Sequence, residues 1–237
     1  MPASLVRKLV PRVQRYSEAD VPTEYGTFHV IVYREDGSPY EHCALVKGDV
    51  SGQEGVPVRV HSECFTGEVL HSLKCDCREQ LDAAMRYIAN AGTGAILYLR
   101  QEGRGIGLGN KIKAYALQES GADTVDANRM LGFGDDLRRY YAASAMLADL
   151  NIRSIALLTN NPAKVKALRA DGIDVASRIP VHITPNSYSR GYLDTKRERM
   201  GHMLPLDWAP EDEGDGAGEG DGDGDVGRED TAVKPRR

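Results

Sequence analysis

Three cysteines lie close together in the sequence, and thiolates are strong ligands for zinc. Cys64, Cys75 and Cys77 fall within fourteen residues, while the fourth cysteine stands apart. A zinc ion with three protein ligands keeps a position for water, whose pKa the metal lowers, as in catalytic sites. The spacing leaves two alternatives open. One is three cysteines packed as small apolar residues, and the other is a closed structural zinc completed by one of His61, His71 or Cys43.

A glycine-rich stretch, QEGRGIGLG (101–109), follows an apolar run and precedes a helical pattern. Glycines allow a close approach of the backbone to a ligand, and the amide groups at a helix N-terminus attract phosphate. The stretch matches neither a Walker loop nor G-x-G-x-x-G. A phosphate-binding loop and a purely structural turn are both compatible with it.

A second strand-to-helix junction, LTNNPAK (158–164), offers a hydroxyl at Thr159 and a cation at Lys164. Asn161 and Pro162 have the residue types of an N-cap and a first-turn proline. A lysine in the first turn is unfavourable for the helix dipole, which indicates that an anion binds beside it. The alternative is a solvated lysine after an ordinary cap.

The elements that must position these residues are of two kinds. Alternating patterns bounded by turn signals predict three strands in an antiparallel meander: 28–33, 43–47 and 56–61. After residue 78 the period becomes helical, with Leu81, Met85 and Ile88 on one face until 90–92. Further helices are predicted at 111–120 and from about 136 to 150. Another is predicted to begin after Asn161 and to end at residue 170. Buried strands are predicted at 95–99 and 155–158, with another extended piece from Val175. The pattern indicates an α/β fold with a mixed sheet flanked by helices and antiparallel N-terminal strands.

The two ends of the chain differ from its middle. Residues 1–24 are predicted to be an N-terminal arm with some helical character. Residues 207–237 are acidic and glycine-rich, and we expect them to be a disordered tail because they cannot bury enough apolar surface. Residues 211–237 contain ten acidic and four basic side chains, so the net charge of −5 becomes +1 over residues 1–210.

The charge and hydropathy patterns exclude several classes of protein. The nearly neutral main part has no strong basic field, so we expect no nucleic-acid partner. No apolar run approaches the roughly 18 to 20 residues that span a bilayer, so we expect no membrane association. The basic N-terminus lacks the apolar core of a secretory signal, and we therefore predict a cytoplasmic protein, in which disulfides are uncommon.

Taken together, the motifs resemble the GTP cyclohydrolase II family, whose members open GTP at the start of riboflavin biosynthesis. The resemblance runs in order from about residue 25 to 204 and implies one catalytic domain over 25–206. Its segments are RVHSECFTGEVLHSLKCDCREQLDAAM (59–85), LRQEGRGIGLGNKIKAYALQ (99–118), DTVDANRMLGF (123–133), LLTNNPAKV (157–165) and YLDTKRERMGHML (192–204). This combination is far more specific than any single motif.

The resemblance implies roles for particular residues. Cys64, Cys75 and Cys77 match the zinc ligands, with water as the fourth. GTP contacts are implied at Arg59, Val60, His61, Ser62, Glu63, Gln80, Glu102, Gly103, Arg104, Thr124, Thr159 and Lys164. Catalytic roles are implied for Asp136 as proton acceptor, for Arg138 as nucleophile, and for Tyr115 in the reaction at the purine ring. Gln80 or Glu102 is expected to read the guanine edge.

The implied reaction releases formate and pyrophosphate from GTP and leaves 2,5-diamino-6-(5-phosphoribosylamino)pyrimidin-4(3H)-one. The resemblance further implies one Zn²⁺ per subunit, Mg²⁺ bound with the triphosphate, and a homodimer. A guanidinium is almost never deprotonated, so its chemistry favours charge stabilisation by Arg138 over a covalent role. Two alternatives are an arrested enzyme that releases the formamidopyrimidine nucleotide and a non-catalytic, zinc-stabilised nucleotide-binding module.

Overall fold

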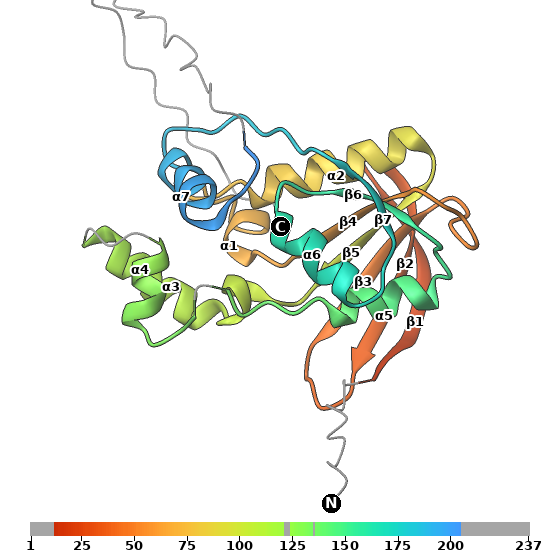
Figure 1. Cartoon of the computed structure of the whole chain (residues 1–237), viewed down its shortest axis with the longest axis horizontal. Helices are drawn as coiled ribbons and strands as arrows, with labels where there is room; N and C mark the ends of the chain where they lie inside the picture. The colour runs from red at the N-terminus through yellow and green to blue at the C-terminus, as the bar shows by residue number, and fades with distance from the viewer. Residues whose placement is uncertain (1–11, 121–123, 135, 205–237) are drawn as a thin grey trace, which may run out of the picture. The chain divides into compact units, whose positions relative to one another are not determined.

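A seven-stranded mixed sheet organises the part of the chain that the computed structural model describes, residues 12–120, 124–134 and 136–204. The strand order is β1-β2-β3-β5-β4-β6-β7 (Figure 1). The strands are β1 (Val13–Thr23), β2 (Gly26–Glu35), β3 (Glu41–Lys47), β4 (Val56–Ser62), β5 (Gly94–Leu99), β6 (Ile155–Leu158) and β7 (Val175–Ile179). Pairings from β1 to β5 are antiparallel and those from β5 to β7 are parallel. The predicted mixed sheet is confirmed.

The first strand replaces part of the predicted arm. Residues 13–23 form β1 and pair with β2 along its whole length, so the helical character expected there is wrong. The connection is tight, because Gly26 adopts a left-handed φ of 89° and the Thr23 hydroxyl donates to its carbonyl at 2.7 Å. Nine of the eleven residues of β1 are exposed, so the strand forms through its partner and not through an apolar face of its own.

The predicted meander is confirmed for β2 and β3 and is wrong for β4. β5 pairs antiparallel with β3 and separates it from β4. β4 instead pairs in parallel with β5 on one side, where Val58 lies opposite Ala95, and with β6 on the other. β4 is almost entirely buried, as is typical of a parallel strand at the centre of a sheet.

Helices cover both faces of the sheet. The side chains of β5 alternate between the two cores, with Leu97 on one side and Ile96 on the other. The Leu97 side packs against α5 (Tyr141–Asp149) and α6 (Pro162–Ala170), which contribute Met146 and Leu168. The Ile96 side packs against α2 (Cys77–Ala91), which contributes Ile88. The result is a three-layer arrangement (Figure 1).

Most helix predictions differ from the structure only at the ends. α6 begins after Asn161, whose side chain accepts a hydrogen bond from the Ala163 amide at 2.9 Å, as its sequence predicted. α3 (Leu108–Glu119) starts earlier than expected. The helix expected from about residue 136 begins only at Tyr141, as α5, and residues 136–140 are not helical. α4 (Thr124–Met130) and α7 (Arg190–Met200) were not predicted.

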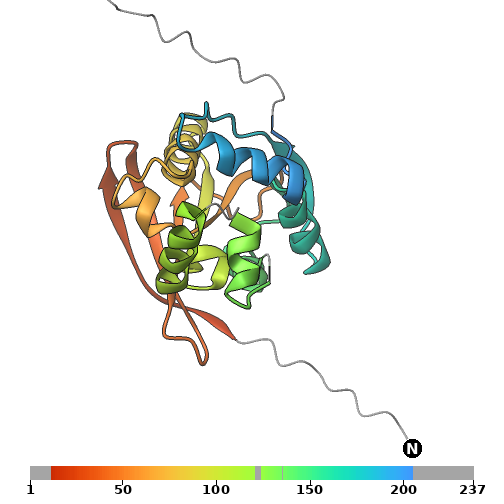
Figure 2. The same ribbon diagram turned by 90° about the vertical axis from the view of Figure 1, so that its left-hand side faces the viewer.

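The candidate residues follow the carboxyl ends of the parallel strands. Cys64 comes after β4, Glu102 after β5 and Thr159 after β6, so the three segments meet at one edge of the sheet. α3, α4 and α7 lie beyond this edge, and α4 contacts both of the others (Figures 1 and 2). Ligand sites of α/β sheets occupy the same edge.

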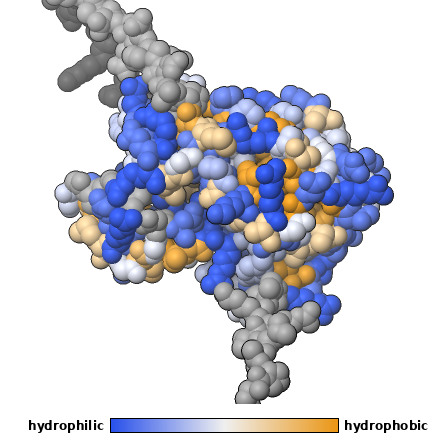
Figure 3. Space-filling model, viewed as in Figure 1, coloured by the Kyte–Doolittle hydropathy of each residue, from blue (hydrophilic) through white to orange (hydrophobic). Residues whose placement is uncertain are grey.

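The surface is mainly hydrophilic in the view of Figure 3, with apolar side chains gathered right of its centre and where α3 and α4 lie. Ile112 of α3 is 48% exposed and Met130 of α4 is 66% exposed. In the described residues, each helix is too short or too polar to cross a bilayer. The tail predicted for 207–237 and the first eleven residues lie outside the described part of the chain.

Candidate metal and anion site

Three thiols meet at the edge of the sheet. The Sγ atoms of Cys64, Cys75 and Cys77 lie within 4.8 Å of one another, and those of Cys64 and Cys75 are 3.6 Å apart. Cys64 immediately precedes the single-turn helix α1 (Phe65–Glu68), and Cys77 is the first residue of α2. In the described chain no other cysteine, histidine or carboxylate belongs to this group. The arrangement offers three soft ligands on one side of a metal position.

Gly67 leaves room for the sulfur atoms. A Cβ at this position would lie 3.0 Å from the Cys75 sulfur and 3.3 Å from the Cys64 sulfur, so any larger residue would crowd them. The pKa of Cys64 is lowered by hydrogen bonds from the other two thiols and by the nearby Lys111 ammonium, while that of Cys75 is raised to about 11. Three convergent thiols around this glycine cradle fit a zinc ion.

The alternatives for a fourth protein ligand have other partners or positions. His61 Nε2 lies 2.7 Å from a Glu68 carboxylate oxygen, and its ring stacks on Tyr98. Cys43 lies on β3 and His71 is exposed; neither is among the grouped ligands. A polar cluster around the sulfurs also argues against simple apolar packing. The described residues therefore favour an open site over a closed one.

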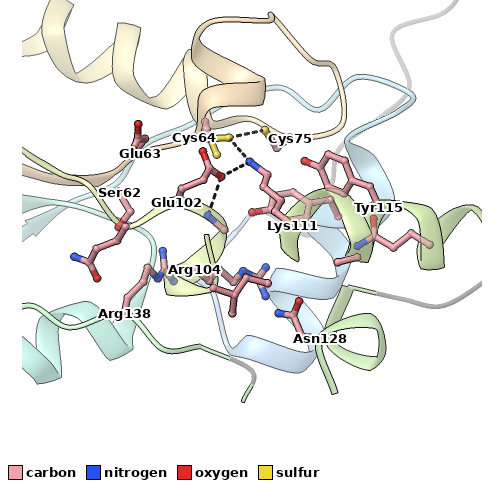
Figure 4. A pocket seen from close by; sticks show the side chains of 17 residues that line it. Ser62, Glu63, Cys64, Cys75, Glu102, Arg104, Lys111, Tyr115, Asn128 and Arg138 are labelled. Carbon is pink, nitrogen blue, oxygen red and sulfur yellow. Dashed lines mark hydrogen bonds and ion pairs between the residues drawn. The ribbon is translucent and has the colours of Figure 1, made fainter. Parts of the chain in front are cut away.

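Glu102 and Lys111 form the polar floor beside the sulfurs (Figure 4). The Lys111 ammonium donates to Cys64 Sγ at 3.1 Å and to Glu102 Oε1 at 2.7 Å. Burial alone would lower the pKa of Lys111, but Cys64 and Glu102 raise it above its usual value. The Glu102 carboxylate also accepts from the amides of Phe65 and Gly103. It thus ties α1, the glycine-rich loop and α3 together.

Tyr115 lies on α3 beside the thiols. It lines the same cavity as the cysteines, and the Lys74 ammonium lies 4.9 Å from the centre of its ring. Burial raises the pKa of Tyr115 to about 12, against the opposing effect of Lys111. The phenol is therefore protonated at neutral pH.

The glycine-rich loop aims Arg104 into the cleft. Gly103 and Arg104 both have left-handed backbones, with φ values of 62° and 58°, and such a conformation costs a non-glycine residue about 1–2 kcal/mol. Within the described chain, both terminal nitrogens of Arg104 are buried without a hydrogen-bond partner. The Leu137 amide donates to the Arg104 carbonyl at 3.1 Å, and Gly105 packs closely on Leu137. The loop therefore brings the Arg104 and Arg138 segments together.

Asp136 and Arg138 form a two-pronged ion pair. Arg138 Nε donates to Asp136 Oδ1 at 2.9 Å, and Nη2 donates to Oδ2. The Arg138 amide also donates to Oδ1 at 3.0 Å, which is possible because this segment precedes the helix. Burial alone would raise the pKa of Asp136, but the guanidinium holds it below its usual value. Burial opposes the charge on Arg138, yet Tyr140 and Asp136 raise its pKa further. Both groups are charged.

Arg59 and Lys164 line the second part of the cleft. The Lys164 side chain is buried, and its Nζ donates to the Val60 carbonyl at 2.6 Å. Burial and the charges of Arg59 and Arg138 lower its pKa well below the usual value. Arg59 donates to the Leu158 carbonyl at 3.0 Å, but its Nε is buried with no partner in the described chain. Such unsatisfied buried donors are costly and point to a ligand.

Gln80 and Thr159 have side chains that are already engaged. The Gln80 amide accepts from Arg59 and donates to Asp76. Thr159 Oγ1 accepts from the Asn161 amide at 3.0 Å. With the Glu102 carboxylate similarly occupied, the two residues expected to read guanine both have protein partners. Their role at the guanine edge stays a prediction.

Two adjoining cavities form the cleft, with about 620 and 670 Å³ of atom-free space, part of which is open solvent. They share the side chains of Ser62, Cys77, Arg104, Arg138 and Tyr192. We call the cavity with the three thiols the sulfur half and the other the cationic half. Most of the predicted contact residues line one of them: Arg59, His61, Ser62, Glu63, Gln80, Glu102, Gly103, Arg104, Thr159 and Lys164.

Three predicted residues are not in the cavity walls. Val60 is buried in the core and offers only its backbone. Asp136 pairs with Arg138, which lines both cavities. Thr124 is the first residue of α4, but its side chain lies outside the described structure. Further residues in the walls were not predicted: Lys111, Asn128, Tyr192, Lys196 and His202. Of these, the last three belong to the segment YLDTKRERMGHML, which had a resemblance but no assigned role.

Comparisons with known proteins identify the family of the chain. The sequence profile of the GTP cyclohydrolase II family matches residues 14–180. The chain is 54% identical over 195 residues to the riboflavin biosynthesis protein RibBA of Chlamydia trachomatis and 50% identical over 192 residues to that of Chlorobium phaeovibrioides. These alignments cover 82% and 81% of the chain but 46% and 47% of the relatives, so the chain spans about half their length. It is 48% identical over 193 residues to the GTP cyclohydrolase-2 of Actinobacillus succinogenes, covering 81% of the chain and 89% of that protein.

Proposed function

Because the chain belongs to the GTP cyclohydrolase II family, we propose that it hydrolyses GTP in the first step of riboflavin biosynthesis. The reaction opens the imidazole ring at C8 and releases formate and pyrophosphate, leaving 2,5-diamino-6-(5-phosphoribosylamino)pyrimidin-4(3H)-one. The observation that carries this proposal is that three thiols share one cleft with a group of cations, and that in the described chain buried nitrogens of Arg104 and Arg59 lack a partner.

The cationic half suits the triphosphate. Arg104 directs two unpartnered nitrogens into it, and Arg59 directs one. Arg138 adds charge to the same cavity, and the buried Lys164 amine would gain a proton beside a bound anion. Phosphate oxygens would satisfy these donors and offset the repulsion among the cations, which burial strengthens. Mg²⁺ bound with the triphosphate belongs to the same proposal.

The sulfur half suits the purine ring. Cys64, Cys75 and Cys77 would hold one zinc ion, which supplies Lewis acidity and lowers the pKa of bound water. Tyr115 beside them keeps its proton at neutral pH and can donate it to the nitrogen that leaves C8. Lys111 holds the Glu102 carboxylate and Cys64 in place.

Arg138 acts in this proposal by its charge. Its guanidinium is held by the Asp136 carboxylate, and its raised pKa opposes the deprotonation that nucleophilic attack requires. A fixed guanidinium can stabilise the charge that develops when the bond between the α- and β-phosphates breaks. Asp136 orients it. The homodimer and the cytoplasmic location are further parts of the proposal.

The direct test is to incubate the whole chain with GTP and Mg²⁺ and to follow formate, pyrophosphate and the ultraviolet absorbance of the product. We expect all three signals. Treatment with a zinc chelator should abolish formate release, and added zinc should restore it. Release of pyrophosphate without formate would identify the arrested enzyme, and binding of GTP without any product would identify the non-catalytic module.

Replacing Tyr115 by Phe should separate the two hydrolyses. Without the phenolic proton, formate release is expected to slow by roughly a hundredfold or more, whereas pyrophosphate release should change little. Quenched time courses of both products from one reaction measure the difference. Tyr87→Phe, on the exposed face of α2, is the matched control. Equal slowing of both products would remove Tyr115 from the ring chemistry.

A further inference from the structure

Residues 190–204 lie beyond the part of the chain that the family profile matches, yet they form one wall of the cationic half. The profile ends at residue 180, whereas Tyr192 and Lys196 of α7 and His202 after it line the cavity. The reaction proposed above uses none of them. A cation and an imidazole in this position need an explanation.

The segment is held firmly against the rest of the cleft. Leu193 is only 1% exposed, which anchors α7 through its apolar side. Gly201 ends the helix with a left-handed φ of 64°, and the chain then turns back along the cleft. There the Met203 amide donates to the Asn160 carbonyl at 2.9 Å, in the same loop as Thr159. The wall is thus joined to the loop after β6.

Lys196 is a buried cation with one carboxylate partner. Its residue is 8% exposed, and its ammonium lies 2.7 Å from Asp76 Oδ1 and 4.3 Å from the centre of the Tyr192 ring. Burial would lower the pKa of Lys196, but Asp76 and Tyr192 raise it above its usual value, so the side chain is charged. Lysine is almost never buried without a counter-charge.

Two carboxylates do not balance the charge of this cavity. Four cations line the cationic half, Arg59, Arg104, Arg138 and Lys196, together with Lys164, whose pKa is lowered. In the described part of the chain, the acidic side chains that face them are Asp76 and Asp136. His202 adds no positive charge, because burial and the neighbouring cations lower its pKa to about 3. The cavity therefore has an excess of positive charge that suits a ligand with several negative charges.

We propose that Lys196, with His202 beside it, is a further phosphate-binding residue that contacts the polyphosphate chain of a nucleoside triphosphate. The inference rests on the proposed function of the cleft. An anion that satisfied the unpartnered nitrogens of Arg104 and Arg59 would lie in the cavity that Lys196 also lines. The Tyr192 ring lies between, 5.6 Å from the Arg104 guanidinium. α7 thus completes an anion site begun by the loops after β4, β5 and β6.

The competing explanation is that Lys196 only pins α7 to the loop through Asp76. The two explanations predict different ligand dependence. A phosphate contact affects ligands in proportion to their phosphates, whereas a structural anchor affects every ligand of the cleft alike and lowers the melting temperature.

Calorimetric titration of the zinc-loaded full chain with α,β-methylene-GTP and with guanosine distinguishes them. Lys196→Gln should weaken binding of the analogue by about tenfold or more and leave guanosine binding unchanged, because a charged hydrogen bond to phosphate is lost. Lys196→Arg should retain most of the affinity. Arg197→Gln, which removes the same charge one residue away on α7, should match the parent.

Unchanged binding of the analogue by Lys196→Gln, or equal weakening of both ligands, overturns the inference while leaving the proposed function intact. Failure of the parent to bind the analogue overturns both. Should Lys196→Gln not fold, the histidine NMR signals of the parent give a second measurement. The His202 ring signals, identified with His202→Gln, should shift on addition of the analogue and not of guanosine. A lack of any shift overturns the inference.

Discussion

The Cys75→Ser protein, supplied with GTP and Mg²⁺, is expected to release no measurable formate. Cys75 Sγ lies 3.6 Å from Cys64 Sγ, within the group of three thiols. A serine hydroxyl is a poor zinc ligand at neutral pH, so the substitution should weaken zinc binding. A catalytic metal contributes several kcal/mol to the stability of a charged transition state, so its loss slows the reaction by roughly a thousandfold or more. Formate detection and the zinc content of the purified protein are measured together.

Cys43→Ser is the matched control, since Cys43 lies on β3 outside the group of three thiols. It should keep both its zinc and its activity. Formate release by Cys75→Ser at the parental rate would disprove the metal hypothesis. Loss of activity with full zinc content would place Cys75 in another role.

Substitution of Arg138 is expected to have the second largest effect. Arg138→Met removes a buried charge and leaves Asp136 without its partner, so GTP turnover should fall by roughly a hundredfold to a thousandfold. Arg138→Lys keeps a positive charge but cannot form the two-pronged pair, so a loss of about tenfold is expected. Steady-state rates of pyrophosphate release give the comparison.

A rapid-quench experiment with GTP labelled in the α-phosphate completes this test. Charge stabilisation predicts that the parent protein retains no label after denaturation, whereas a covalent role for Arg138 predicts a labelled protein. Arg139→Lys, in the same segment but exposed, controls for changes in the loop. A labelled parent whose label disappears in Arg138→Lys would refute the charge-stabilising role.

Elements with strong local signals could be predicted from the sequence. β6 and α6 were predicted within a residue, because an apolar run is followed by Asn161, a capping residue, and Pro162, a first-turn proline. β1 and α7 lack such signals. β1 is almost fully exposed, and α7 buries little besides Leu193 and Lys196 in a highly polar sequence. Their structures depend on partners that are distant in the chain.

The residues of the candidate site also differ in whether the local sequence could predict them. The three thiols could be predicted because residue type alone restricts what they can bind. Lys111 could not, because a lysine in the second turn of a helix is ordinary until the fold places it 3.1 Å from Cys64. On the helix predicted from about residue 136, Asp136 and Arg138 would not pair, because residues two apart on a helix do not face each other. It forms because the helix begins only at Tyr141.

The outer strand β1 bears on how the protein behaves at high concentration. A strand with one free side is a template onto which another chain can add, and flat apolar edges promote fibril growth. β1 instead exposes Arg15, Glu18 and Asp20 along its length and carries Pro22, which lacks an amide hydrogen. Irregular pairing with β2 between Arg15 and Ser17 further disturbs its flatness. The charges and the proline oppose pairing of β1 with a strand of another molecule, and so they oppose aggregation at high concentration.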